Sequence, residues 1–171
     1  MPNTNVYTGM DGAITIAVDD ASTPEGQAAS GVAEAFALAP IGRATDVSVQ
    51  VTSAMRPYHE IGQRYATELR AGNVNVTGSM GRAHINGALL RLMLGDAGAG
   101  TRPGGPFISP TFNLSLVLEN PSRPGQRSTI TVHGVKIDGW SFATPEDDFV
   151  LESVTFKALW IGAEDASGEG A

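Results

Sequence analysis

The strongest constraint on the fold comes from an alternating apolar stretch between positions 134 and 161. This stretch holds both tryptophans and three of the six phenylalanines of the chain. Val135 and Ile137 point to one side of an extended strand, whereas Trp140 points to the other side. A change of parity of this kind is what a β-bulge at residues 138–139 produces. We therefore expect one long strand with a bulge near its middle.

A polar turn at residues 144–148 separates this strand from a second one. The second strand has a period of two, which is typical of a strand with one face on a core and one face in water. Its apolar positions are Val154, Phe156, Ala158 and Trp160, which alternate with Ser153, Thr155, Lys157 and Leu159. The two strands are antiparallel if they pair. They form the spine of a β-domain, and both tryptophans are expected in its core.

The composition excludes several classes of protein. The chain has 171 residues and no cysteine, so it is long enough for one domain and lacks disulfides and thiolate chemistry. No apolar run approaches the roughly 20 residues that span a bilayer, and the N-terminus has no signal-peptide pattern. A net charge of -7 disfavours attraction to nucleic acid or to anionic lipid. We expect a protein without a membrane anchor that stays in a cytosol-like compartment until it is released.

The remaining pattern adds short strands and one clear helix. Residues 84–94 have apolar side chains at helical spacing and are followed by Gly95, a plausible C-cap. Residues 27–39 are alanine-rich and fit a short helix or an extended strap equally well. Further strands are expected at residues 13–18, 45–52, 73–77, 111–119 and 128–133. The fold class is then mainly β with one flanking helix. Residues 1–11 and 163–171 are expected to be a flexible arm and a frayed tail of a single domain.

The segment at residues 53–72 has no clean period. It is charged and is interrupted by Pro57 and Gly62. A long loop without structure of its own is unusual in a compact domain and is commonly functional. A protruding hairpin that packs on a neighbouring copy would explain the segment, and a surface helix over residues 58–70 is the alternative.

A search for chemistry finds no catalytic pattern. The three histidines are far apart, and none has the spacing of metal ligands. The acidic run at residues 146–148 lacks the alternating ligand spacing of a calcium loop and fits a solvated turn. The glycines at residues 95–100 follow a helix, and no Gly-Lys-Ser or Gly-Lys-Thr comes after them. We therefore expect no catalytic residue, no cofactor and no metal site, which makes an enzyme the weakest interpretation.

Several blocks of the sequence, taken in order, resemble tail tube proteins of tailed bacteriophages. The blocks are YTGMDGAITIAV, PIGRATDVSVQVTS, IGQRYATELRAGNVNVTGSMGRAHINGALLRLMLG, PFISPTFNLSLVLENPS, GVKIDGWSF and PEDDFVLESVTFKALWI. Residues 27–39 and 95–106 fit the resemblance less clearly. The resemblance implies a β-sandwich or small β-barrel with a flanking helix. It also implies hexameric rings that stack into a hollow tube for the delivery of phage DNA.

The resemblance further implies partners and a place. The tape-measure protein and DNA would occupy the lumen, and tail terminator and baseplate proteins would bind the ends of the tube. A sheath protein would surround the tube only if the tail is contractile. The protein would be part of the virion tail and would lie in the host cytoplasm during assembly.

Two sets of residues are candidates for this function. The polar rows of two strands would line the lumen without any cation, which predicts an electronegative wall that does not bind DNA. These residues are Asp46, Ser48, Gln50, Thr52, Asn73, Asn75 and Thr77. The irregular segment would supply the contact between subunits or between rings. Its candidates are the anchors Tyr58, Ile61 and Tyr65 with the charged partners Arg56, Arg64 and Arg70.

Two other interpretations stay open. The first is a ring or hub component of a baseplate or injection system that does not polymerise. The second is a stand-alone β-sandwich module that binds a sugar or a partner protein. Such a module would show exposed aromatic residues in a row, whereas aromatic residues make up only 6% of this chain.

Overall fold

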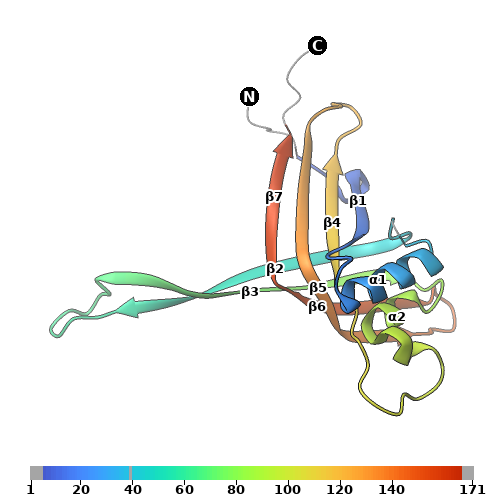
Figure 1. The fold of residues 1–171 in the computed structure, drawn as a ribbon. Helices are drawn as coiled ribbons and strands as arrows, with labels where there is room; N and C mark the ends of the chain where they lie inside the picture. The colour runs from blue at the N-terminus through green and yellow to red at the C-terminus, as the bar shows by residue number, and fades with distance from the viewer. Residues whose placement is uncertain (1–5, 39, 167–171) are drawn as a thin grey trace.

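The structure is a computed structural model that describes residues 6–38 and 40–166. The described residues form seven antiparallel strands in the order β1-β4-β5-β6-β3-β2, with β7 paired to β5. The strands are β1 (Gly12–Val18), β2 (Ala44–Tyr58), β3 (Glu68–Ala83), β4 (Phe112–Glu119), β5 (Arg127–Ala143), β6 (Leu151–Ala158) and β7 (Trp160–Ala166). The helices α1 (Pro24–Ala35) and α2 (Ala88–Leu94) lie at one end of the sheet (Figure 1). Short 3-10 turns cover Gly9–Asp11 and Gly95–Gly98.

One bent strand divides the sheet into two halves. The first half of β5 pairs with β4 and β7, and its second half pairs with β6. The bend lies at Gly134, whose φ of +65° is rare for any residue with a side chain. The amide of Leu159 donates to the carbonyl of His133 at 3.0 Å, so the link between β6 and β7 bends at the same place. Figure 1 shows β1, β4 and β7 upright, with β2 and β3 crossing below them.

We name the two halves separately. The first half-sheet contains β1, β4, the N-terminal half of β5 and β7. The second half-sheet contains the C-terminal half of β5, β6, β3 and β2. The predicted bulge is confirmed, because the β5–β6 register shifts between Ile137 and Gly139. The antiparallel pairing of the two C-terminal strands and the mainly β fold class are confirmed as well.

The core fills the space between the two half-sheets and the helices. Leu89 and Leu92 of α2 are fully buried, and they belong to one cluster with Phe112 of β4 and Phe156 of β6. Val135 at the bend of β5 is also fully buried. Burying each side chain of this size contributes about 1.5–3 kcal/mol, so the core holds the bend in place.

Most of the alanine-rich segment is a helix, because α1 continues to Ala35, whereas residue 39 lies outside the described residues. A helix is thus the one of the two alternatives that the structure supports. Helix α1 begins earlier than residue 27, because Thr23 is its N-cap and accepts a hydrogen bond from Gly26 N at 3.1 Å. Pro24 occupies the first turn, where a missing N–H costs nothing. In the preceding turn, hydrogen bonds from the side chain and the amide of Ser22 lower the pKa of Asp20.

The second helix is shorter than the sequence suggests. Helix α2 begins at Ala88, and Ile85, which we expected on its buried face, is 54% exposed. Asn86 accounts for the late start, because its Oδ1 accepts a hydrogen bond from Ala88 N at 3.2 Å. Gly95 ends the helix with a φ of +57°, as its sequence position indicates.

Trp160 is not a core residue, which corrects the expectation for the C-terminal strand. Its side chain is 55% exposed and stacks on the ring of His133, with centroids 3.6 Å apart. Leu159 lies at the bend between β6 and β7 and belongs to neither strand. The alternation of core-facing and solvent-facing side chains therefore changes by one residue at this position. Ile161 therefore packs against the core in place of Trp160, whereas Trp140 does pack against it.

The ends of the chain also differ from expectation. Residues 163–166, which we expected in a frayed tail, belong to β7 and pair with β5. Gly9–Asp11 of the expected N-terminal arm form a 3-10 turn capped by Thr8. Residues 1–5 of the expected arm and 167–171 of the expected tail lie outside the described residues.

A buried ion pair joins the strands of the second half-sheet. Arg82 of β3 and Glu152 of β6 are both about 1% exposed, and the Arg82 Nε donates to Glu152 Oε1. The Trp140 Nε1 donates to Glu152 Oε2 at 3.0 Å. The guanidinium also donates to the side chain of Asn86 at 3.1 Å. The carboxylate of Glu152 thus connects β3, β5 and β6, and the guanidinium of Arg82 adds the segment that precedes α2.

Breaking this pair on one side is expected to destabilise the fold strongly. Glu152→Ala leaves the charge of Arg82 buried without an acidic partner, which costs about 3–5 kcal/mol of unfolding free energy. Urea unfolding followed by circular dichroism measures this loss. The double variant Arg82→Met with Glu152→Leu is the control and should recover most of the stability. A loss below about 1 kcal/mol in the single variant would contradict this role of the pair.

Candidate assembly surfaces

The second half-sheet has one polar face that is open to solvent. The register of β2 and β3 places Ser48 opposite Ser79 and Gln50 opposite Thr77. The row continues onto β6, where Thr155 lies opposite Ser79. The residues of opposite parity, such as Val47 and Val49 of β2, pack against the core. The half-sheet is therefore apolar on one face and polar on the other, as its alternation predicts.

The structure places most of the predicted lumen residues on this polar face. The residues of β2 and β3 that share it are Asp46, Ser48, Gln50, Thr52, Asn75 and Thr77. Asn73 lies where the β2–β3 register shifts, between Val74 and Ala71, and is exposed. Six of the seven predicted residues are thus brought together on one surface, and the position of the set in a lumen stays a proposal.

Two lysines lie on this polar face, and sequence reasoning did not connect either of them with the lumen candidates. Lys136 of β5 lies directly opposite Lys157 of β6, and the chain contains no other lysine. The Lys157 Nζ is 3.7 Å from Asp138 Oδ2, and Thr155 Oγ1 donates to the other oxygen of Asp138 at 2.7 Å. The seven lumen candidates themselves include no cation, and the electronegative wall stays a prediction, but these two lysines lie on the neighbouring strands of the same face. The signal was available, because Lys157 alternates with Phe156 and so has the polar parity of its strand.

The hairpin of β2 and β3 extends far beyond the rest of the molecule. The pairing of β3 with β6 ends at Val76, but β2 and β3 remain paired to Tyr58 and Glu68. We name residues 52–75 the arm. Its ladder from Thr52 to Tyr58 spans roughly 20 Å at the usual rise of a strand. Figure 1 shows the arm projecting away from the body.

The arm confirms the protruding hairpin that the sequence suggested and excludes the alternative surface helix. The sequence of this segment has no clean period because no third strand or core contact among the described residues imposes one. A two-stranded hairpin alone is marginally stable in water. The arm therefore has the properties of an element that is completed by another molecule.

The two faces of the arm differ in chemistry. Met55, Leu69 and Val74 continue the core-facing parity of Val51 and Val76, yet they are 57%, 67% and 61% exposed. Sequence reasoning missed these three residues, although an apolar face at the spacing of a strand is their signal.

The predicted contact residues lie on the other face and in the tip. Arg56 lies opposite Arg70, and Tyr58 lies opposite Glu68, whose Oε1 accepts a hydrogen bond from Arg70 Nε at 3.1 Å. Ile61 is fully exposed in the tip loop. The remaining two predicted residues, Arg64 and Tyr65, are also exposed in this loop. The exposed apolar side chains of the arm are not covered by any described residue of the same chain. Such a large exposed apolar surface is typical of an interaction site.

Among the strands that the structure describes, the second half-sheet has two open edges. Strand β2 is the last strand of the sheet order, and the C-terminal half of β5 pairs with β6 on one side only. Open edges present unpaired N–H and C=O groups and readily add a strand from another chain. The same half-sheet thus offers an edge at each side, a polar face and a projecting arm.

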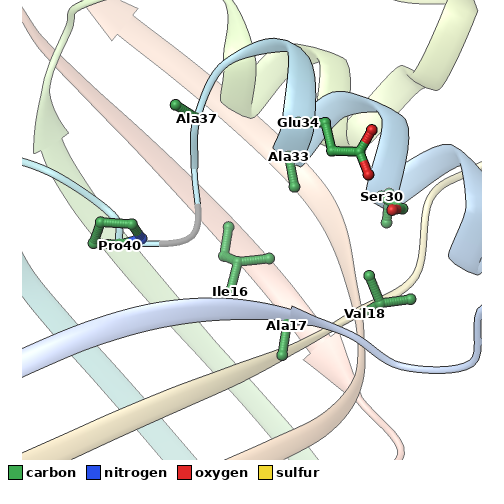
Figure 2. Close-up of a pocket in the computed structure, with 9 residues that line it drawn as sticks. Ile16, Ala17, Val18, Ser30, Ala33, Glu34, Ala37 and Pro40 are labelled. Atoms are coloured by element: carbon green, nitrogen blue, oxygen red, sulfur yellow. The ribbon is translucent and has the colours of Figure 1, made fainter.

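A separate apolar cavity of about 500 Å³ lies between β1 and α1. Figure 2 shows Ile16 and Val18 pointing from β1 toward α1, with Ala33 pointing back toward them. Glu34 is the one charged residue of the lining. This cavity lacks the convergent polar groups that fix a small ligand. Among the residues that the structure describes, no group of three or more histidine, aspartate or glutamate side chains could hold a metal ion.

No helix in the described part of the chain has the length and apolar character needed to cross a membrane. No protein-family model matches the chain, and no curated protein sequence matches it.

Solved structures match the whole fold. A chain of the tube terminating cap of the anti-feeding prophage superposes with a TM-score of 0.65 at 8% identity, covering 97% of this chain and 95% of that chain. A chain of the sheath–tube complex of the extracellular contractile injection system PVC gives 0.63 at 9% identity, covering 95% and 94%. The SPP1 tail tube gives 0.53 at 13% identity, covering 95% and 80%. The chain has the fold of phage tail tubes and of the tube components of contractile injection systems.

The lysine pair gives a prediction about stability. Like charges directly opposite each other on neighbouring strands are destabilising. Lys136→Glu replaces this repulsion with an attraction and should raise the unfolding free energy by about 0.5 kcal/mol at low salt. The gain should shrink at high salt, because exposed charges are screened. Urea unfolding at both salt concentrations tests this, with Lys136→Gln as the control that removes only the repulsion. A Lys136→Gln variant less stable than the wild type at low salt would argue against repulsion.

Proposed function

We propose that this protein is a structural virion protein that polymerises as stacked hexameric rings into a hollow tail tube, through which phage DNA is delivered. The observation that carries the proposal is the second half-sheet, which is incomplete in one copy. It has two open edges, a polar face and an arm with an uncovered apolar face. The fold likeness to tail tubes and injection-system tubes supports the same function.

The open edges support a closed ring. In a ring, the β2 edge of one copy would meet the β5 edge of the next copy. The second half-sheets of all copies would then join into one continuous barrel wall. A head-to-tail contact of this kind closes into a ring if its rotation is a whole fraction of a turn. Closure removes the free edges, which is how β-barrels avoid unwanted strand addition.

The polar face supports a water-filled lumen. The other face of the same strands packs against the core, so it cannot line the barrel. The polar face would therefore point to the inside of the barrel. The tape-measure protein and later DNA would pass along Ser48, Gln50, Thr77 and their neighbours. Hydroxyl and amide groups with few cations bind phosphates weakly, so they suit a conduit. The positions of the lumen residues are part of this proposal.

The partners and the place follow from the proposed tube. Matched chains come from structures described as a sheath–tube complex, a tube terminator and a tube terminating cap. By analogy, this protein would bind terminator and baseplate proteins in the virion tail, after assembly in the host cytoplasm. A sheath would surround it only in a contractile tail. The function proposed is structural and not enzymatic.

A second candidate is a ring that does not polymerise, such as a terminator or hub component. The likeness to a tube terminating cap favours it, because its TM-score of 0.65 is as high as that to the sheath–tube complex, at 0.63. A terminator would form rings of the same size but would lack the contact that repeats along a tube.

Negative-stain electron microscopy of the purified protein, with its mass from light scattering, tests the proposal. Hollow tubes are expected, either from the protein alone or after addition of tail initiator complexes. Sixfold rings that never extend on such seeds would favour the terminator. Monomers that neither assemble nor extend seeds would refute both candidates.

The apolar face of the arm generates a prediction about assembly. The triple variant Met55→Gln, Leu69→Gln and Val74→Thr should abolish tube formation, because burial of each replaced side chain would contribute about 1.5–3 kcal/mol to the contact. Since these side chains are exposed in one copy, the unfolding free energy should change by less than about 0.5 kcal/mol for each substitution.

Microscopy and urea unfolding of the same samples check both statements. Met10→Gln is the matched control, because Met10 is 96% exposed and lies outside the arm. Tubes of normal length from the triple variant would show that this face of the arm is not part of the assembly contact.

A further inference from the structure

The two lysines of the chain are concentrated at one point of the polar face. Lys136 of β5 and Lys157 of β6 occupy directly opposite positions, and we name them the lysine pair. Outside the arm, the four strands of the second half-sheet contain one other cationic residue, Arg82, and it is buried. The lysine pair is therefore the only exposed positive charge on these strands outside the arm.

Only one of the two ammonium groups has an acidic partner. The Lys157 Nζ is 3.7 Å from Asp138 Oδ2, and the side chain of Lys157 is still 73% exposed. Lys136 forms no salt bridge with any described residue. Because like charges directly opposite each other are destabilising, the fold keeps an unneutralised ammonium here against its own stability.

Lys157 lines a hollow in the polar face that is rich in hydrogen-bond donors. The hollow has a volume of about 320 Å³ and lies between residues of β2, β3 and β6. The hydroxyl groups of Ser48, Thr77 and Ser79 line it and have no hydrogen-bond partner among the described residues. Thr77 lies directly opposite Lys157 in the register of β3 with β6. An ammonium group beside free hydroxyl groups is a donor set that proteins use to bind phosphate oxygens.

The lysine pair does not neutralise the acidic residues around the start of α1. Both lysines also line a hollow of about 380 Å³, which is bordered by Asp19, Asp20 and Glu25. No salt bridge joins a lysine to any of these three carboxylates. The pKa of Asp20 is lowered by its hydrogen bonds with the side chain and the amide of Ser22, and no lysine contributes. Balance of this acidic charge therefore does not account for the pair.

We propose that the lysine pair and the adjacent hydroxyl groups bind phosphate groups, and that their ligand is the phosphodiester backbone of nucleic acid passing along the polar face. The source of the phosphates rests on the proposed function, whereas the site itself is complete in one copy. A lysine ammonium is a compact charge that neutralises a phosphate without reading a base. Two lysines beside Asp138 leave one net positive charge, so each contact is weak and reversible.

In the proposed tube, the site acts as a brake on the passing nucleic acid. Copies related by rotation place their lysine pairs at the same level of a ring, and stacked rings repeat this level along the tube. Neutralising a phosphate releases condensed counterions, which makes such contacts strongly dependent on salt. Nucleic acid is therefore retarded at each ring at low salt and passes more freely at high salt.

Binding of a short fluorescent oligothymidylate to the full-length protein tests the site. Fluorescence anisotropy measures binding to single copies, and co-sedimentation measures binding to assembled protein. The variant with Lys136→Gln and Lys157→Gln should lose about tenfold in affinity at about 50 mM salt, and its affinity should change less between about 50 and 200 mM salt. Inorganic tripolyphosphate should compete with the oligonucleotide, because both present phosphate oxygens.

Three further variants separate charge at this site from other effects. Arg102→Gln with Arg127→Gln removes the same charge from exposed positions outside the second half-sheet, and affinity should fall less than about twofold. Lys136→Arg with Lys157→Arg should retain binding, because the positive charge remains. Lys157→Gln alone should also weaken binding, and it leaves the open β5 edge unchanged, so a defect in ring closure cannot produce the effect.

The outcomes distinguish this inference from the proposed function. Equal affinities of the double lysine-to-glutamine variant and the arginine control would overturn the site, because the attraction would then be general. Binding of tripolyphosphate without binding of the oligonucleotide would overturn the assignment to nucleic acid. If either result came from protein that forms normal tubes, the proposed function would stand. Binding that depends on the lysine pair in a protein that never forms rings would support the site and count against the tube.

Discussion

The bend of β5 at Gly134 is the feature on which the rest of the structure depends. A positive φ of +65° at this position turns the strand, and the β6–β7 link bends beside it at Leu159. Because one strand serves both half-sheets, the core can be enclosed between them without a second layer of strands. The second half-sheet then has only one face on the core, which leaves its other face polar and its outer edges open.

An incomplete sheet has a physical consequence beyond the single copy. Open edges and an uncovered arm are costly in an isolated protein, since they expose unpaired backbone groups and apolar side chains to other chains. The same groups become an advantage when identical copies cover one another in a closed ring. The proposed tube accounts for the edges by closure within a ring and for the arm by contact between rings. A binding module of the same fold would leave both unexplained.

Sequence reasoning predicted those features that alternation or composition determines. The β class, the bulge near Gly139 and the polar row of β2 all follow from a period of two. It could not predict what depends on tertiary geometry. The bend at Leu159 exposed Trp160, and the register of β5 with β6 brought Lys136 opposite Lys157. The apolar face of the arm was also missed, because no core contact makes its period conspicuous.

The lysine pair refines the physical picture of the proposed lumen. Each copy has a net charge of -7, yet its only two lysines meet on the polar face beside Asp138. Repulsion between two lysines would be avoided by almost any other residue at either position, so stability alone does not account for the pair. In a ring, the pairs would form a narrow cationic band in an otherwise polar wall. Such a band would slow a passing polyanion locally without holding it. The lysine pairs contribute few charges, and dissolved salt screens their attraction to phosphate groups.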